Sequence, residues 1–95
     1  MMNITFWGVR GSIPCPGPGT VRYGGNTACL ELLIGQEQRR IIIDAGSGIR
    51  DLGNHLMAIH PNGEPIEADI FLTHTHWDHI MGFPFFAPMY LPTSR

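Results

Sequence analysis

Runs of hydrophobic residues, separated by polar and glycine-rich segments, predict four short strands. They are residues 3–9 (NITFWGV), 26–34 (NTACLELLI), 39–44 (RRIIID) and 68–73 (ADIFLT), which are rich in β-branched, aromatic or leucine side chains. Within the third strand, residues 41–43 are three consecutive isoleucines without alternation, so both faces of this strand are expected to be covered. The sheet is therefore predicted to be one layer inside a sandwich.

A helical period follows the third strand. Apolar residues fall on one face of residues 49–60, at Ile49, Leu52, Leu56 and Ile59. His55 and His60 lie on or near this helix and are interpreted as surface or helix-end histidines. Residues 61–65 (PNGEP) carry the turn chemistry that ends a helix.

Two segments show neither a strand-like pattern nor the period of a helix. Residues 8–25 hold six of the 12 glycines and three of the eight prolines, which predicts a loop. This loop is either a simple connection between strands or a substrate-binding element, in which Arg10 and Arg22 could offer a bidentate fork to a phosphate. Residues 83–92 carry three prolines and four aromatic side chains and are predicted to pack against the core or to form the wall of a pocket.

Composition narrows the class of protein. A chain of 95 residues with 43% hydrophobic side chains forms one small domain, 1–95, with a real core. A net charge of −2 provides no basic surface for non-specific nucleic-acid binding. We expect a cytoplasmic protein without a membrane span or a signal peptide. Cys15 and Cys29 are expected to be reduced thiols, with a disulfide between them as the alternative.

The most informative segment is residues 74–79 (HTHWDH), which we call the HxHxDH segment. It contains three of the five histidines and a carboxylate, the donors that zinc and similar divalent metals prefer. In extended backbone, His74 and His76 point to the same side and can bind one ion together. Asp78 and His79 are adjacent and diverge, unless a turn directs both toward a second point. The alternative interpretation is a solvated polar turn after a buried strand.

A second carboxylate, Asp44, stands at the end of the third predicted strand, before the flexible sequence AGSG. It is either a cap for the following helix or a functional group, and the sequence favours neither.

These residues resemble the metallo-β-lactamase-fold metallohydrolases. HxHxDH is the metal signature of that superfamily, and Asp44-Ala45-Gly46 is a second, weaker match. The opening at residues 6–32 (FWGVRGSIP…RYGGNTACLEL) is similar to the branch that contains ribonuclease Z-like enzymes and phosphodiesterases.

The resemblance implies the N-terminal half of an αββα sandwich, an α/β (α+β) fold with a mixed sheet and one main helix. It implies two Zn²⁺ ions per complete site, with Mn²⁺ or Fe²⁺ as alternatives. His74 and His76 would bind the first ion, and Asp78 and His79 the second. Asp44 would order the ligand loop.

For the reaction, the resemblance implies a hydrolase in which a hydroxide shared by two metals attacks a phosphodiester or a cyclic phosphate. The substrate would be a small-molecule or nucleotide phosphoester. Asp78 would also act in catalysis, by orienting the nucleophile or relaying a proton. Arg10, Asn26 and Thr27 are the candidates for substrate binding.

The chain departs from the family pattern after the HxHxDH segment. No histidine follows His79, and no acidic residue follows Asp78, although the family site needs further ligands. We expect the missing ligands to come from a C-terminal segment of a longer protein, or alternatively from a second copy in a homodimer. Two other functions stay open, a mononuclear iron dioxygenase of the same fold and a non-catalytic metal-binding or interaction module.

Overall fold

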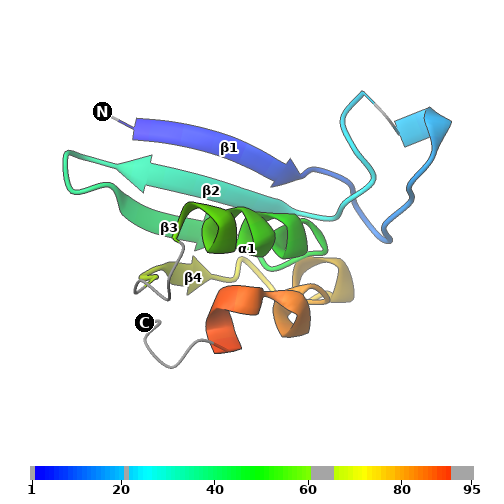
Figure 1. Ribbon diagram of the computed structural model, residues 1–95. Helices are drawn as coiled ribbons and strands as arrows, with labels where there is room; N and C mark the ends of the chain where they lie inside the picture. Colours follow the sequence, from blue (N-terminus) through cyan, green and yellow to red (C-terminus); the bar gives the residue numbers. More distant parts are fainter. Residues whose placement is uncertain (1, 21, 61–65, 91–95) are drawn as a thin grey trace.

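Four strands form one mixed sheet in the order β1-β2-β3-β4 (Figure 1). Their bounds are β1 (Met2–Gly8), β2 (Cys29–Ile34), β3 (Arg39–Ile43) and β4 (Asp69–Phe71). The first three strands are antiparallel neighbours, and β4 pairs with β3 in parallel. The four predicted strands and the predicted mixed α/β class are confirmed.

The computed structural model describes residues 2–20, 22–60 and 66–90. The predicted turn at residues 61–65 and the end of the predicted apolar segment at 91–92 lie outside these ranges.

The second strand begins three residues later than predicted. Thr27 makes only an isolated parallel bridge with Arg10, and its backbone N–H donates to the Ser47 hydroxyl at 2.9 Å. A residue whose N–H is bound to a side chain cannot use it in the ladder of a sheet. Residues 26–28 therefore belong to the long connection and not to β2.

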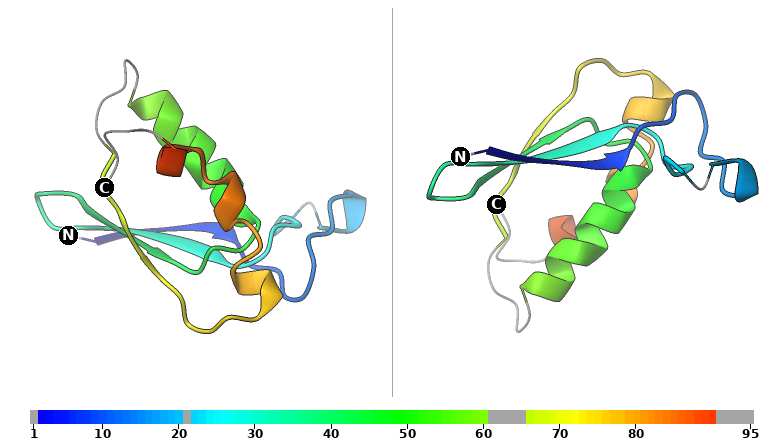
Figure 2. Two further views of the ribbon diagram at one scale, coloured as in Figure 1. Left: turned by 90° about the horizontal axis from the view of Figure 1, so that it is seen from below. Right: turned by 90° about the horizontal axis from the view of Figure 1, so that it is seen from above.

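The main helix, α1 (Gly48–Ile59), lies across one face of the sheet (Figure 2). Ile49, Leu52 and Leu56 of its predicted apolar stripe are buried and pack with Ile42 of β3. Ile59, at the end of the helix, is 48% exposed and does not belong to the core. The core consists of Cys29, Ile42, Ala45, Ile49, Leu52, Leu56, Ile66 and Phe86. None of the helices in the described ranges has both the length and the apolar composition to span a bilayer.

Short 3-10 turns at Phe83–Phe85 and Ala87–Tyr90 pack beside α1 on the same side of the sheet (Figure 2). Phe86 and Pro88 are buried there, which confirms the predicted apolar packing of this segment. Gly53 of α1 makes the close packing possible, because a Cβ at this position would lie 3.0 Å from the Phe86 ring. The absence of a side chain at Gly53 therefore lets the segment at Phe86 and Pro88 pack against α1.

The opposite side of the sheet carries apolar side chains and is not covered by α1. Cross-strand partners point to the same side, and the register places one apolar set there. We call this set the open face: Met2, Ile4, Phe6, Leu30, Leu32, Ile34, Ile41, Ile43 and Phe71.

The prediction that both faces of β3 are covered is wrong, because α1 covers only one of them. Ile42 is fully buried under α1, whereas Ile41 and Ile43 on the open face are only half-buried. Phe6 and Phe71 are 66% and 55% exposed. α1 covers only one face of β3. The run of isoleucines still fits a strand in the middle of a sandwich, in which this part of the chain supplies the layer on one side.

Candidate metal centre

The ends of three strands meet at one end of the sheet. β3 and β4 are parallel, so Asp44 and the HxHxDH segment both follow strand ends at the same edge. β1 runs in the same direction as β3, which places the loop at residues 9–28 there as well. In Figure 2 the segment after β4 (yellow) curves on the side of the sheet opposite α1.

The Asp44 side chain connects the end of β3 to the segment after β4 by hydrogen bonds. Its carboxylate is 5% exposed and accepts three hydrogen bonds, from the Thr73 backbone N–H at 2.8 Å, the Thr73 hydroxyl at 2.9 Å and His79 Nδ1 at 2.8 Å. Burial raises the pKa of Asp44, but the bonds from Thr73 and His79 outweigh it, so the pKa is lowered. Ser47, not Asp44, occupies the N-cap position of α1. Asp44 therefore orders the segment after β4.

His79 is held so that its second ring nitrogen faces Asp78. With Nδ1–H bound to Asp44, the neutral ring carries its lone pair on Nε2, which lies 3.4 Å from Asp78 Oδ2. Two lone pairs at this distance repel each other unless a metal cation or a proton lies between them. Two donors about 2.1 Å from a tetrahedral metal ion lie roughly 3.4 Å apart. The Asp78–His79 pair therefore fits a divalent cation.

The other two histidines of the segment gather beside this pair. The ring centroids of His74 and His79 are 4.0 Å apart, and those of His74 and His76 are 4.6 Å apart in an edge-on arrangement. Within the described ranges, however, no three His, Cys, Asp or Glu side chains are arranged to hold one ion. This part of the chain thus offers ligands in pairs and not a complete cage.

Ser12 is a site residue that the sequence did not reveal. Its backbone N–H donates to Asp78 Oδ2 at 3.1 Å. This bond is the main reason that the pKa of Asp78 is lowered, with further contributions from His79 and His74. The contact joins residues 66 positions apart, so no spacing rule could have found it. In the sequence, only the glycine-rich composition of residues 8–25 indicated that this loop could have a role.

The predicted substrate-binding residues Asn26 and Thr27 have structural partners. Thr27 is fully buried, and it exchanges hydrogen bonds with Ser47, whose N–H donates to the Thr27 hydroxyl at 2.7 Å. The Asn26 amide donates to Asp51 at 3.0 Å, and its oxygen accepts from Ser47. Both polar groups of Thr27 bind the turn before α1, and substrate binding by Asn26 and Thr27 stays a prediction.

The two arginines predicted to form a phosphate fork have different neighbours. Arg10 Nε donates to the Ile13 carbonyl at 2.8 Å, inside its own loop. The Arg22 guanidinium lies over the Tyr23 ring, 5.2 Å from its centroid. A shared fork is therefore not formed in the structure, and substrate binding by Arg10 stays a prediction.

Close backbone approach joins the turn after β3 to the HxHxDH segment. The Ala45 N–H donates to the His79 carbonyl at 2.8 Å, and the Gly82 N–H donates to the Ala45 carbonyl at 2.9 Å. A Cβ on Gly46 would lie 2.5 Å from the Asp78 carbonyl oxygen. Glycine is required at this position because the two backbones are in contact.

The remaining histidines lie on or next to α1, and the two cysteines are free thiols. The His55 ring packs on Trp7 with centroids 5.3 Å apart, and His60 caps the end of α1. Cys15 is exposed and Cys29 is buried. Burial and the nearby Glu31 and Asp44 carboxylates raise the pKa of Cys29 to about 12.

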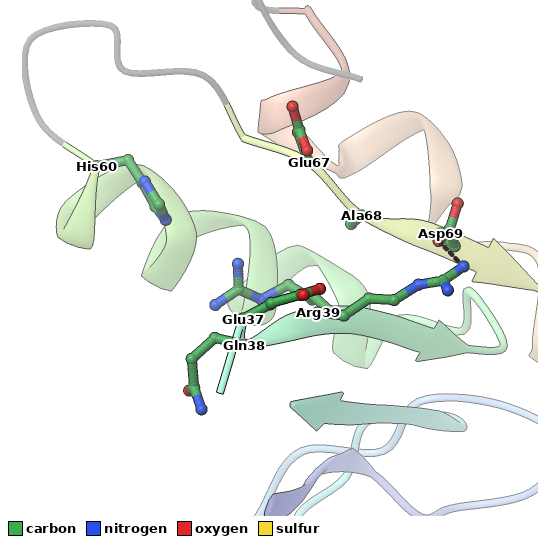
Figure 3. A pocket seen from close by; sticks show the side chains of 8 residues that line it. Glu37, Gln38, Arg39, His60, Glu67, Ala68 and Asp69 are labelled. Carbon is green, nitrogen blue, oxygen red and sulfur yellow. Dashed lines mark hydrogen bonds and ion pairs between the residues drawn. The ribbon is translucent and has the colours of Figure 1, made fainter. Parts of the chain in front are cut away.

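A polar pocket of about 750 Å³ lies at the opposite end of the sheet (Figure 3). Arg39 reaches from β3 to Asp69 on β4 beside it, at 3.0 Å. Its lining residues are Glu37, Gln38, Arg39, Arg40, His60, Glu67, Ala68 and Asp69. None of them belongs to the HxHxDH segment, so the pocket and the candidate metal centre are separate.

Comparison with known families agrees with this geometry. A sequence model described as the metallo-beta-lactamase superfamily matches residues 14–88. The chain belongs to the metallo-β-lactamase superfamily. Members of this superfamily usually bind metal ions.

Two proteins illustrate the relationship. An atrochrysone carboxyl ACP thioesterase of Aspergillus novofumigatus is 35% identical over 75 residues, which are 79% of this chain and 22% of the relative. A solved metallo-beta-lactamase candidate from Thermotoga maritima is 22% identical, with a TM-score of 0.47 over 92% of this chain and 40% of that one. The chain thus spans about a fifth of the length of the curated relative.

Proposed function

We propose that this chain supplies part of the metal site of a hydrolase. The observation that carries the proposal is the Asp78–His79 pair, in which Asp44 directs the His79 Nε2 lone pair toward a carboxylate oxygen at 3.4 Å. That arrangement is stable only with a cation or a proton between the two atoms. The membership of the metallo-β-lactamase superfamily supports the cation.

In the proposed site, His74 and His76 hold one Zn²⁺, and Asp78 and His79 hold the second, with Mn²⁺ or Fe²⁺ as alternatives. When bound, such ions lower the pKa of a water ligand to about 7 and polarise the bond to be cut. Asp44 keeps the proton on His79 Nδ1 and so leaves Nε2 free for the metal. In this proposal Asp78 also acts in catalysis, by orienting the nucleophile or relaying a proton. The remaining ligands come from a further segment of a longer protein or from a second copy of the chain.

We propose a phosphodiester or a cyclic phosphate as the substrate. The support is the resemblance of residues 6–32 to ribonuclease Z-like enzymes and phosphodiesterases. A thioester is the second candidate, because a relative that is 35% identical is a thioesterase. Both reactions use an activated water on an electrophilic centre, so one metal site serves either.

The test is hydrolysis by the zinc- or manganese-loaded protein that carries residues 1–95. Bis(p-nitrophenyl) phosphate and an acyl thioester are offered in parallel, with and without EDTA. We expect chelator-sensitive release of p-nitrophenol. Asp78→Asn should lower that rate about 10²–10⁴-fold, whereas the exposed Asp69→Asn, far from the centre, should leave it unchanged.

Cleavage of the thioester alone would transfer the proposal to the second substrate. No chelator-sensitive cleavage of either compound would contradict the hydrolase assignment.

A further inference from the structure

The glycine-rich loop between β1 and β2 reaches the candidate metal centre at one atom. The Ser12 N–H points at Asp78 Oδ2 and lies 3.1 Å from it. The same oxygen faces His79 Nε2 at 3.4 Å. A carboxylate oxygen has two lone pairs, so it can accept the Ser12 N–H and still bind a cation. The loop therefore contacts the oxygen that the metal would use.

The Ser12 backbone has an unusual conformation for a residue with a side chain. Its φ angle is 74°, in the left-handed region that favours glycine. In the described ranges, the other non-glycine residues with positive φ are Gln38, in the β2–β3 hairpin, and Asp44. Asp44 and Ser12 thus both adopt this conformation, and each binds a residue of the Asp78–His79 pair. Such strain persists where surrounding contacts hold it.

The loop is anchored near both of its ends. The Arg10 N–H donates to the Asn26 carbonyl at 3.0 Å, and the Cys15 N–H donates to the Gly25 carbonyl at 2.9 Å. These bonds define the short excursion on which Ser12 stands. A loop tied at both sides can present one N–H in a fixed direction.

We propose that the Ser12 backbone N–H is a positioning group for Asp78, which holds Oδ2 beside His79 Nε2 so that both face one divalent cation. The β1–β2 loop is then a part of the metal centre and not only a connection between strands. The inference rests on the proposed metal site but not on the substrate. It predicts that the N–H matters and that the serine hydroxyl does not.

The test is zinc binding by this chain, measured by calorimetry and by the absorption spectrum of the cobalt-substituted protein. Ser12→Pro removes the N–H, and it also excludes the positive φ that directs this group at Asp78, so it should weaken zinc binding about tenfold or more. Ser12→Gly keeps the N–H and suits the positive φ, so it should bind zinc within about twofold of the natural chain. Gly11→Pro places the same ring one residue earlier, where the backbone N–H is not the one that binds Asp78, and it is the matched control.

A second measurement needs no proline. The Ser12 amide resonance should show slow hydrogen exchange in the natural chain, and Asp78→Asn should shift it upfield and remove the protection. Catalytic activity enters neither readout, so loss of the hydrolase assignment leaves the result intact.

Four outcomes of the binding experiment overturn the proposal. They are the absence of zinc binding by the natural chain, unchanged binding in Ser12→Pro, an equal loss in Ser12→Gly, and an equal loss in Gly11→Pro. A Ser12 amide that does not respond to Asp78→Asn overturns it as well.

Discussion

At the scale of the residue, the candidate centre depends on a buried carboxylate in a strained backbone. Asp44 has a φ of 68° and is 5% exposed, yet it accepts bonds from Thr73 and His79. The left-handed conformation costs on the order of 1–3 kcal/mol. The three bonds offset that cost because a charged acceptor binds N–H and O–H donors strongly.

Asp44→Asn should therefore lower the free energy of unfolding by about 1–3 kcal/mol at pH 7, because the amide presents donors to His79 where the carboxylate accepts. The effect depends on pH. The folded pKa of Asp44 lies below the unfolded value of about 3.9, so the stabilisation is fully present above that value and is lost as pH falls through the folded pKa. Urea denaturation at several pH values measures this difference.

The control for that experiment is Asp69→Asn, which alters an exposed ion pair and should change the free energy of unfolding by less than about 0.5 kcal/mol. A difference between natural chain and Asp44→Asn that stays constant down to low pH would contradict the assigned role of the ionised carboxylate.

At the scale of the element, the parallel pairing of β3 and β4 brings two turns into contact. The turn after β3 is held on one side by the two hydrogen bonds between Thr27 and Ser47. On the other side it is held by backbone hydrogen bonds to the HxHxDH segment and Gly82. Gly46 lies between them, where a Cβ would come within 2.5 Å of both the Asp78 carbonyl and the Thr27 hydroxyl. Packing of backbone on backbone thus sets the position of the ligand residues.

Gly46→Ala should lower the free energy of unfolding by about 1–3 kcal/mol, because overpacked atoms have no flexible neighbour to displace. It should also weaken zinc binding, since the Asp78 backbone must move. Gly11→Ala is the matched control, because a Cβ there meets nothing within 4 Å. Thermal or urea denaturation and a zinc titration measure the two effects. Equal behaviour of the two variants would contradict the close approach seen here.

At the scale of the whole molecule, one sheet face is packed and the other is open. α1 and the last 3-10 turns lie on one side (Figure 2). The open face carries exposed aromatic side chains at Phe6 and Phe71. An apolar surface of this kind is typical of an interface and not of a solvated face. It agrees with a chain that spans 22% of its curated relative.

The open face should bind a hydrophobic dye. We expect the 95-residue chain to enhance the fluorescence of anilinonaphthalene sulfonate, and Phe6→Thr to reduce the enhancement with little loss of stability, because Phe6 is already 66% exposed. Tyr23→Thr is the control, since Tyr23 is 71% exposed but stands on the loop. A larger decrease with Tyr23→Thr than with Phe6→Thr would contradict this assignment.

Local elements and the chemistry of the candidate ligands could be predicted from the order of residues alone. Strands and helix follow from runs and periods of apolar residues, and the clustering of His74, His76, Asp78 and His79 in six positions indicates metal chemistry without any structure. These features are local, so residue type and spacing are enough to predict them.

The folded structure was needed to show how distant residues contact that cluster. It showed that Asp44 binds His79 and does not cap α1, that Thr27 is buried against Ser47, and that the Ser12 N–H reaches Asp78. It also showed that residues 41–43 are covered on one face only. Such contacts depend on strand direction, loop path and backbone conformation, which the order of residue types along a chain does not encode locally.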